Sequence, residues 1–283
     1  MQLLTAEQRR FWETDGYLHL PQVLDADDVA LFSTEIDRIR GLPGYEPDRN
    51  PELPIGHYTW MDHAPDLNPK GFMDRRQLLG YGQAFIDLMD RSPVFDYIVD
   101  IMGPNILLSM TQAIVRPSTD KFPGYTHTDG GESLRLTRVT ETSVPIAVKA
   151  MYILTDVTER DSGNLTVFPG SHMRPIPVHG DRLITPDSPG AAQLMARAGD
   201  VILFPHALWH GPARNVSGRT RKILLYNYCQ LWVRCYDHHD IAALGQRCSA
   251  RQRRLLGDLG YDFRPGSYFY VPKDQESVIR GGG

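Results

Sequence analysis

The sequence predicts a mainly β protein with added helices, in which a sandwich or small barrel carries a helical cover. After Gly103, β-branched and aliphatic runs follow one another, each bounded by Gly, Pro, Asp or Asn. Before Gly103, apolar residues recur at helical spacing. The chain has 283 residues, of which 41% are hydrophobic, so it is large enough to bury a sizeable core within one domain.

A helix is predicted over residues 25–41, because Asp25 can cap its N-terminus. One face of this helix carries apolar residues at helical spacing: Val29, Phe32, Ile36 and Ile39. A short strand is expected just before it, at residues 16–21. The chain therefore opens with a strand and a helix that packs on a flat surface.

Two further helical signals lie downstream. Residues 83–103 have a helical pattern, in which Ser92 and Pro93 suit the N-cap and first position of a second helix. Near the C-terminus, Ser249 and Gln252 form a capping-box pattern for a late helix.

The segment between the first two helical regions, residues 42–71, is dense in Pro, Gly and Asn and contains Tyr58 and Trp60. Loops of this length are functional lids or disordered linkers, and the embedded aromatic residues favour an ordered lid. The alternative is a loop whose aromatic residues serve only to pack it against the fold.

The strand-like runs of the second half are residues 105–117, 144–157, 164–171, 200–211 and 221–233. Five or more strands in this order point to a sandwich or small barrel. The segment after Trp209, which begins His210, Gly211 and Pro212, is expected to form the mouth of the barrel.

Composition excludes several classes of function. The net charge of −4 and the pI near 6.2 provide no field that would hold nucleic acid. No stretch approaches the roughly 18 apolar residues of a membrane span, and no secretory signal is recognisable, so we expect a cytoplasmic protein. Cys229, Cys235 and Cys248 form no CxxC pair, and we expect reduced thiols.

The stretch GYTHTDGG contains His127 and Asp129, which point to the same side of an extended chain. One more histidine would complete a two-histidine, one-carboxylate site for Fe(II). The candidates are His172, His179, His206, His210, His238 and His239. His210 is preferred because it follows a buried-looking strand. Without a third ligand, His127 and Asp129 would be interpreted as part of a polar surface turn.

Two charged residues stand in otherwise apolar strands. Arg221 opens the run from residue 221 to 233, and a buried guanidinium requires a carboxylate, which a dicarboxylate co-substrate would supply. Lys149 lies inside the run from residue 144 to 157, where an active-site contact is the one explanation available.

Several of these segments together resemble the phytanoyl-CoA dioxygenase family of Fe(II)- and 2-oxoglutarate-dependent oxygenases. They are HTD at 127–129, SGNLTVFPGSH at 162–172, AGDVILFPHALWHG at 198–211, Arg221, and the opening LTAEQRRFWETDGYLHLPQVL at 4–24. The resemblance implies a double-stranded β-helix (a cupin-like jelly roll) with flanking helices.

The resemblance also implies an organisation and a set of site residues. One dioxygenase domain would cover residues 1–283, with a helical N-terminal cover and lid loop at 1–103, the jelly-roll core at 104–235, and a C-terminal helix and tail at 236–283. Iron would be ligated by His127, Asp129 and His210. The 2-oxoglutarate would be held by Arg221 at its distal carboxylate, with Gln112 and Tyr152 lining the same pocket.

The implied reaction consumes O2 and 2-oxoglutarate and releases succinate and CO2 while a small molecule, expected to be a specialised metabolite, is hydroxylated or otherwise oxidised. The carboxylate of Asp129 favours oxygenation, since halogenating relatives lack it. No nucleic-acid or membrane partner is expected, and the oligomeric state is left open. The alternative is a metal-dependent hydrolase or isomerase on a cupin-like barrel.

Overall fold

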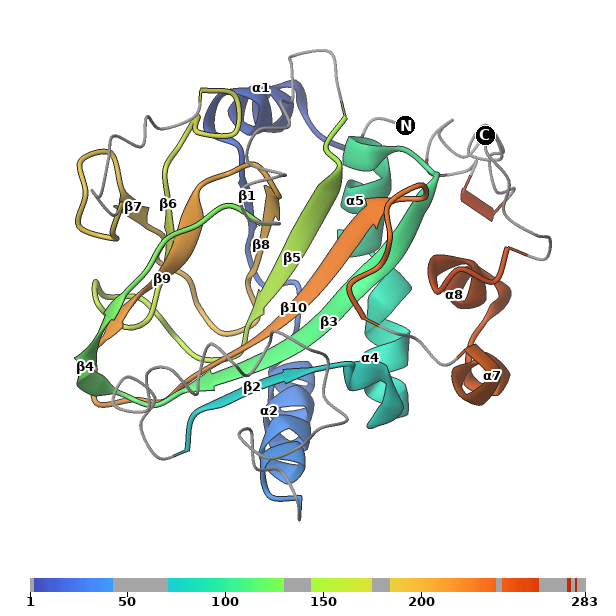
Figure 1. Cartoon of the computed structure of the whole chain (residues 1–283), viewed down its shortest axis with the longest axis horizontal. Helices are drawn as coiled ribbons and strands as arrows, with labels where there is room; N and C mark the ends of the chain where they lie inside the picture. Colours follow the sequence, from blue (N-terminus) through green and yellow to red (C-terminus); the bar gives the residue numbers. More distant parts are fainter. Residues whose placement is uncertain are drawn as a thin grey trace.

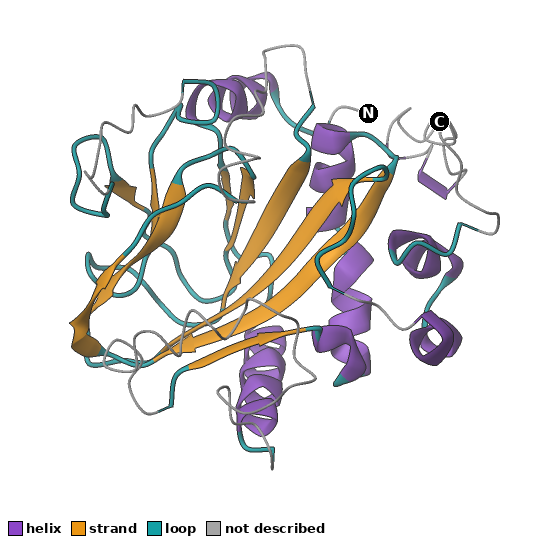
Figure 2. Cartoon of the chain, viewed as in Figure 1, coloured by secondary structure: helices purple, strands orange, loops and turns teal. Residues whose placement is uncertain are grey.

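Two antiparallel sheets form the body of the protein (Figures 1 and 2). The computed structural model describes residues 3–42, 71–129, 144–174, 184–237, 241–259, 274–275 and 278. The large sheet has the strand order β1 (Leu18–Leu20), β8 (Val201–Pro205), β5 (Ala147–Ile153), β10 (Arg221–Gln230), β3 (Ile106–Arg116), β2 (Met73–Arg76). The small sheet has the order β4 (Thr119–Gly124), β9 (His210–Asn215), β6 (Leu165–Val167), β7 (Ala192–Gln193). This arrangement confirms the predicted fold class of a jelly roll with flanking helices.

Helices pack outside the sheets. They are α1 (Ala6–Asp15), α2 (Ala26–Arg40), α4 (Gln83–Asp87), α5 (Val94–Met102), α7 (Ile241–Leu244) and α8 (Ala250–Leu255), with the 3-10 turns η2 (Leu78–Gly80), η3 (Leu88–Asp90) and η4 (Gly245–Arg247). Asp25 caps α2 and Ser249 caps α8, as the sequence predicts, and both caps are capping boxes in the structure. The predicted cap at Ser92 is wrong, because its hydroxyl donates to the Asp96 carboxylate and makes no bond to the backbone of α5.

The large sheet has two apolar faces. Its outer face packs against α2, α4 and α5, and its inner face is turned toward the small sheet (Figure 1). Along β10 the two sets alternate: Leu224 and Tyr226 lie on the outer face, whereas Ile223 and Leu225 lie on the inner face. Both faces of the four central strands are buried, which explains why β3, β5, β8 and β10 are near-continuous apolar runs.

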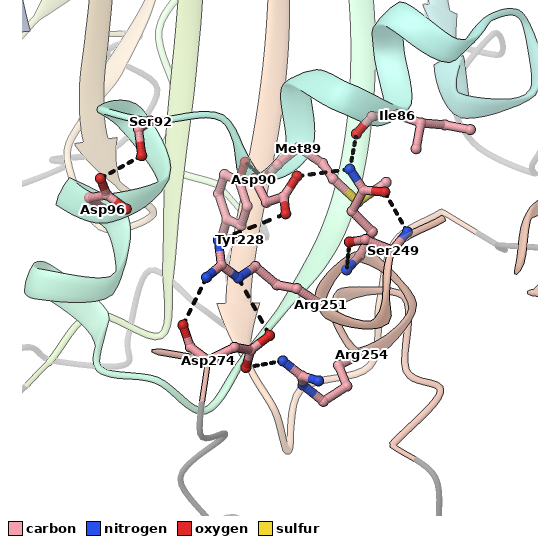
Figure 3. Close-up of polar contacts among 11 residues, drawn as sticks. Ile86, Met89, Asp90, Ser92, Asp96, Tyr228, Ser249, Arg251, Arg254 and Asp274 are labelled. Atoms are coloured by element: carbon pink, nitrogen blue, oxygen red, sulfur yellow. Dashed lines mark hydrogen bonds and ion pairs between the residues drawn. The ribbon is translucent and has the colours of Figure 1, made fainter. Parts of the chain in front are cut away.

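The C-terminal helix α8 is fixed to the helical layer by polar contacts (Figure 3). The Gln252 amide donates to the Asp90 carboxylate at 2.8 Å and to the Ile86 carbonyl at 3.4 Å. Arg251 lies 3.9 Å from Asp90 and 3.6 Å from Asp274, and so connects the residues that follow α8 to the same layer.

Some elements were not apparent from the sequence. The edge strand β2 of the large sheet was not predicted, whereas the other edge strand, β1, confirms the short strand predicted at residues 16–21. The residues from His210 to Asn215, predicted as the barrel mouth, are strand β9, because Gly211 and Pro212 are accommodated in regular pairing with β6. The predicted lid at 42–71 lies outside the described residues apart from its two ends. Within the described ranges, no helix has the length and apolar character needed to cross a membrane.

Candidate metal centre and co-substrate pocket

His127 and His210 are direct neighbours across two antiparallel chain segments. The backbone N–H of His127 donates to the carbonyl of His210 at 2.7 Å, and the N–H of His210 donates back at 2.8 Å. Side chains of such a pair lie on the same side, about 5 Å apart at Cβ. Their imidazole rings are accordingly 4.5 Å apart, centre to centre.

Asp129 joins this pair from two residues along the chain. Its backbone N–H donates to the His206 carbonyl at 3.0 Å, which fixes the backbone beside the two histidines. Its Oδ1 atom lies 3.7 Å from Nε2 of His127 and 3.8 Å from Nε2 of His210. The three potential ligand atoms lie within 4.8 Å of one another, an arrangement that suits one Fe(II) ion.

The protonation states of this group also suit a metal. Burial lowers the pKa of His210 to about 3, so its imidazole is neutral near pH 7. Its Nδ1 lies 2.8 Å from the Leu208 carbonyl, which orients the ring and leaves the Nε2 lone pair toward Asp129. Burial alone would raise the pKa of Asp129, but Lys149 and the two histidines hold it well below its usual range. The donor set is thus two imidazoles and one carboxylate anion.

Gly211 allows the close approach of the two segments. A Cβ atom at this position would lie 1.8 Å from the carbonyl oxygen of Tyr125. Any side chain would therefore force β9 away from the segment that carries His127. The glycine after His210 is a geometric requirement of the histidine pair.

Lys149 contacts a residue of the candidate metal centre, which accounts for a lysine in an apolar strand. It lies on the inner face of β5, only 8% exposed, and its Nζ is 2.7 Å from Oδ1 of Asp129. A buried ammonium is tolerated when a carboxylate pairs with it. Lys149 therefore supports the carboxylate of the candidate metal centre.

Arg221 lies at the start of β10 on the inner face and is 4% exposed. Burial lowers the pKa of its guanidinium to about 9. In the part of the chain that the structure describes, no carboxylate lies within ion-pair distance of it. Its side chain passes over Gly163, where a Cβ would stand 2.8 Å from Cδ of Arg221. The SGN sequence thus leaves room for this arginine.

Arg116 is a second buried arginine beside Arg221, and the sequence did not single it out. It is the direct cross-strand partner of Arg221, is 5% exposed, and its guanidinium lies 3.8 Å from the ring centre of Phe122. Burial lowers the pKa of Arg116 to about 10. The signal was present, because Arg116 ends an apolar run in the way that Arg221 begins one.

Gln112 and Tyr152 point to opposite faces of the large sheet. Gln112 lies on the inner face, and its amide donates to the Asp74 carboxylate at 2.6 Å. Tyr152 lies on the outer face, where its ring contacts that of Tyr226 edge to face at 5.7 Å. This corrects the expectation that Tyr152 lines the co-substrate pocket. Met151, the preceding residue, lies on the inner face instead, with its sulfur 3.7 Å from Nη2 of Arg221.

The other candidate histidines do not join the group. His206 is 1% exposed, and its Nδ1 accepts a hydrogen bond from the Ala147 N–H at 3.4 Å, so it supports the backbone beside Asp129. His172 is buried under Gly16, away from the three ligands. His179, His238 and His239 lie outside the described residues.

Known sequences and structures match most of the chain. The profile of the phytanoyl-CoA dioxygenase family matches residues 12–223. The peroxisomal phytanoyl-CoA dioxygenase of Rattus norvegicus is 24% identical over 251 residues, covering 80% of this chain and 68% of that protein. Ectoine dioxygenase of Stutzerimonas stutzeri (strain A1501) is 23% identical, covering 93% of this chain and 86% of that protein.

Among solved structures, HygX from Streptomyces hygroscopicus with nickel and 2-oxoglutarate bound superposes with a TM-score of 0.65 at 20% identity, over 84% of this chain and 91% of that chain. HygX has also been crystallised with hygromycin B bound. This likeness supports the fold.

Proposed function

The chain belongs to the phytanoyl-CoA dioxygenase family, and on that premise we propose that His127, Asp129 and His210 hold the Fe(II) ion of a 2-oxoglutarate-dependent dioxygenase. Arg221 holds the distal carboxylate of 2-oxoglutarate in this proposal. The family match confirms the family that the sequence predicts. It also confirms the predicted enzyme class, a dioxygenase that uses iron, 2-oxoglutarate and O2.

One observation supports these assignments most strongly. Three metal-ligand atoms converge on the inner side of the barrel that also buries Arg221 without an acidic partner among the described residues. A hydrolase that activates water on a metal has no evident need for that arginine. An enzyme that uses a dicarboxylate co-substrate needs it for a bidentate contact.

Each side chain of the proposed site has a separate role in binding or orienting the reactants. When bound, iron and 2-oxoglutarate would supply the oxidising power of the reaction. One oxygen atom of O2 enters succinate and the other enters the substrate. Burial keeps His210 neutral so that Nε2 can donate its lone pair. Lys149 orients the Asp129 carboxylate through its 2.7 Å contact. Met151 and Leu225 line the inner face and exclude water from the pocket.

The proposed substrate is a small molecule, of the kind found in specialised metabolism, that is hydroxylated or otherwise oxidised. Support comes from the relatives, which include an ectoine dioxygenase and a structural neighbour crystallised with hygromycin B. Residues 1–283 act together in this proposal as one dioxygenase domain. A screen of small molecules for stimulated succinate release identifies the substrate.

Two measurements test the proposal. Anaerobic addition of Fe(II) and 2-oxoglutarate to the purified protein should give a weak visible charge-transfer band, and admission of O2 should yield succinate. Arg221→Ala should lose both at ordinary 2-oxoglutarate concentrations. Substrate turnover that proceeds without O2 and 2-oxoglutarate would contradict the proposal and favour a metal-dependent hydrolase or isomerase.

A further inference from the structure

We propose that Arg116 and Arg221 form a two-arginine clamp in which both guanidiniums bind the distal carboxylate of the co-substrate. The inference rests on the proposed use of 2-oxoglutarate and assigns a binding role to Arg116.

The two arginines lie side by side on the inner face. Arg221 of β10 is paired in register with Arg116 of β3, so the two side chains leave adjacent strands on the same side. On each strand the next inner residue is apolar, Ile223 and Ile114 respectively. Two cations are thus placed together at one end of an apolar surface.

Among the described residues, this pair lacks the anion that two buried cations require. Like charges directly opposite on neighbouring strands destabilise a sheet, and burial of a charge is costly unless it is paired. Neither guanidinium forms an ion pair with any carboxylate of the described residues. Nε of both arginines and Nη1 of Arg116 are buried and lack hydrogen-bond partners there. By contrast, Arg91 on the helical side makes two hydrogen bonds to the Asp28 carboxylate, at 2.7 and 2.6 Å.

The guanidinium of Arg116 is also held in position before any ligand arrives. It lies between two aromatic rings, with its central carbon 4.5 Å from the ring centre of Phe72 and 3.8 Å from that of Phe122. The stem of Arg221 is confined by Gly163. Rigid forks of this kind bind carboxylates with little loss of conformational freedom.

Tyr125 connects the clamp to the candidate metal centre. Its ring stacks on the imidazole of His127 with centres 5.4 Å apart. Its ring also meets that of Phe122 edge to face, with centres 6.1 Å apart, and the Arg116 guanidinium lies over the same Phe122 ring. The rings of Phe122 and Tyr125 therefore form a continuous contact between Arg116 and His127.

Glutarate provides a probe for the clamp alone. It has both carboxylates of 2-oxoglutarate but lacks the 2-oxo group that chelates a metal. Binding of glutarate to metal-free full-length protein, measured by calorimetry and by the shift in Tm, therefore reports on the arginines independently of iron.

The deciding variant is Arg116→Met. We expect it to weaken glutarate binding at least about tenfold, because two charge-assisted hydrogen bonds are lost. In the iron-loaded enzyme the KM for 2-oxoglutarate should rise by a similar factor while the metal affinity stays unchanged. Lys222→Met is the matched control: this cation is adjacent to Arg221 in sequence but lies 2.5 Å from Asp37 on the opposite face. It should bind glutarate as the wild type does.

Unchanged glutarate affinity in Arg116→Met would overturn the clamp and give Arg116 a purely structural role. If that variant does not fold, Arg116→Lys keeps the charge but loses the planar fork, and it should still weaken binding severalfold; wild-type affinity there would equally refute the inference. Failure of glutarate to bind the wild type would do the same, even if iron and 2-oxoglutarate yield succinate. Glutarate binding without any succinate release would leave the clamp supported and count against the proposed reaction.

Discussion

The two faces of the large sheet differ in the polar groups that they bury, although the same strands supply both: the outer face buries uncharged tyrosine hydroxyls, and the inner face buries charged side chains. On the outer face, the hydroxyl of Tyr226 donates to the Phe85 carbonyl at 2.8 Å, and that of Tyr228 donates to the Met89 carbonyl at 2.7 Å. On the inner face, the guanidiniums of Arg116 and Arg221 have buried nitrogen atoms that lack protein partners within the described ranges.

The difference indicates that one face of the sheet serves stability and that the other serves ligand binding. On the outer face, apolar packing and the hydrogen bonds of Tyr226 and Tyr228 stabilise the fold, and the Tyr152 hydroxyl is the exception that has no partner among the described residues. The inner face carries buried charges that lower the stability of the ligand-free protein. The proposed ligands would pair with these charges and offset the cost. Substitutions on the inner face should therefore act on binding and catalysis, and those on the outer face on stability.

Asp129→Ala should have the largest effect of all. Removal of the carboxylate should abolish stoichiometric Fe(II) binding and reduce succinate release below detection, because one of three ligands is lost. It should also lower the free energy of unfolding by about 1–3 kcal/mol, since Lys149 is left buried without its partner. Metal analysis, a coupled succinate assay and urea unfolding measure these effects. Asp120→Ala, an exposed carboxylate on β4, is the control. Wild-type metal content in Asp129→Ala would remove this residue from the centre.

Phe85→Ala should produce the opposite pattern. Phe85 is fully buried in the helical layer, 5.8 Å from the ring of Phe32, so its truncation should lower the free energy of unfolding by about 3–5 kcal/mol. The folded fraction should bind glutarate and Fe(II) as the wild type does. Urea unfolding and calorimetry provide the two readouts. A loss of ligand affinity in the folded variant would show that the two faces are not independent.

The outer tyrosines allow a finer comparison. Tyr226→Phe should lower the free energy of unfolding by about 1 kcal/mol, because the Phe85 carbonyl loses a buried donor. Tyr152→Phe should leave stability unchanged or raise it slightly, since the Tyr152 hydroxyl is buried and has no hydrogen-bond partner among the described residues. The KM for 2-oxoglutarate should not change in either variant. A raised KM in Tyr152→Phe would restore the pocket role that the sequence suggested.

The smallest expected effect concerns an ion pair of the helical layer. The hydrogen bonds from Arg91 lower the pKa of Asp28, so the pair stabilises the folded state above the unfolded-state pKa of about 4, and this contribution is lost as pH falls through the folded-state pKa. Arg91 is 41% exposed at its side chain, which limits the contribution to at most about 1 kcal/mol. The difference in unfolding free energy between wild type and Arg91→Gln should shrink between pH 6 and about pH 3. A constant difference would contradict this assignment.

The features predicted correctly from the sequence are those with local signals. The caps Asp25 and Ser249 depend on residues three positions apart, and the apolar runs coincide with β3, β5, β6, β8 and β10. The convergence of His127, Asp129 and His210 was inferred from segments distant in sequence but similar to a known family, and the structure brings the three together. Strand β9 was missed because Gly and Pro usually interrupt strands.

The residues assigned wrongly or missed depend on which face each strand position occupies. Lys149, Met151 and Ile153 share one face of β5, so the contact of Lys149 with Asp129 places Tyr152 on the other face. In an apolar strand buried on both sides, composition does not indicate which alternate set faces the ligand. Arg116 was missed for a related reason, because its register with Arg221 appears only when β3 and β10 pair.

The close contact at Gly211 limits how this centre could be transplanted. A designer who grafts the three ligand side chains onto another barrel, while leaving an alanine or serine after the second histidine, would separate the strands that hold the two imidazoles. The transferable unit is therefore a pair of backbones at a fixed separation, and the ligands are attached to it. Saturation libraries at position 211 should recover glycine among metal-binding clones, even where every ligand residue is intact.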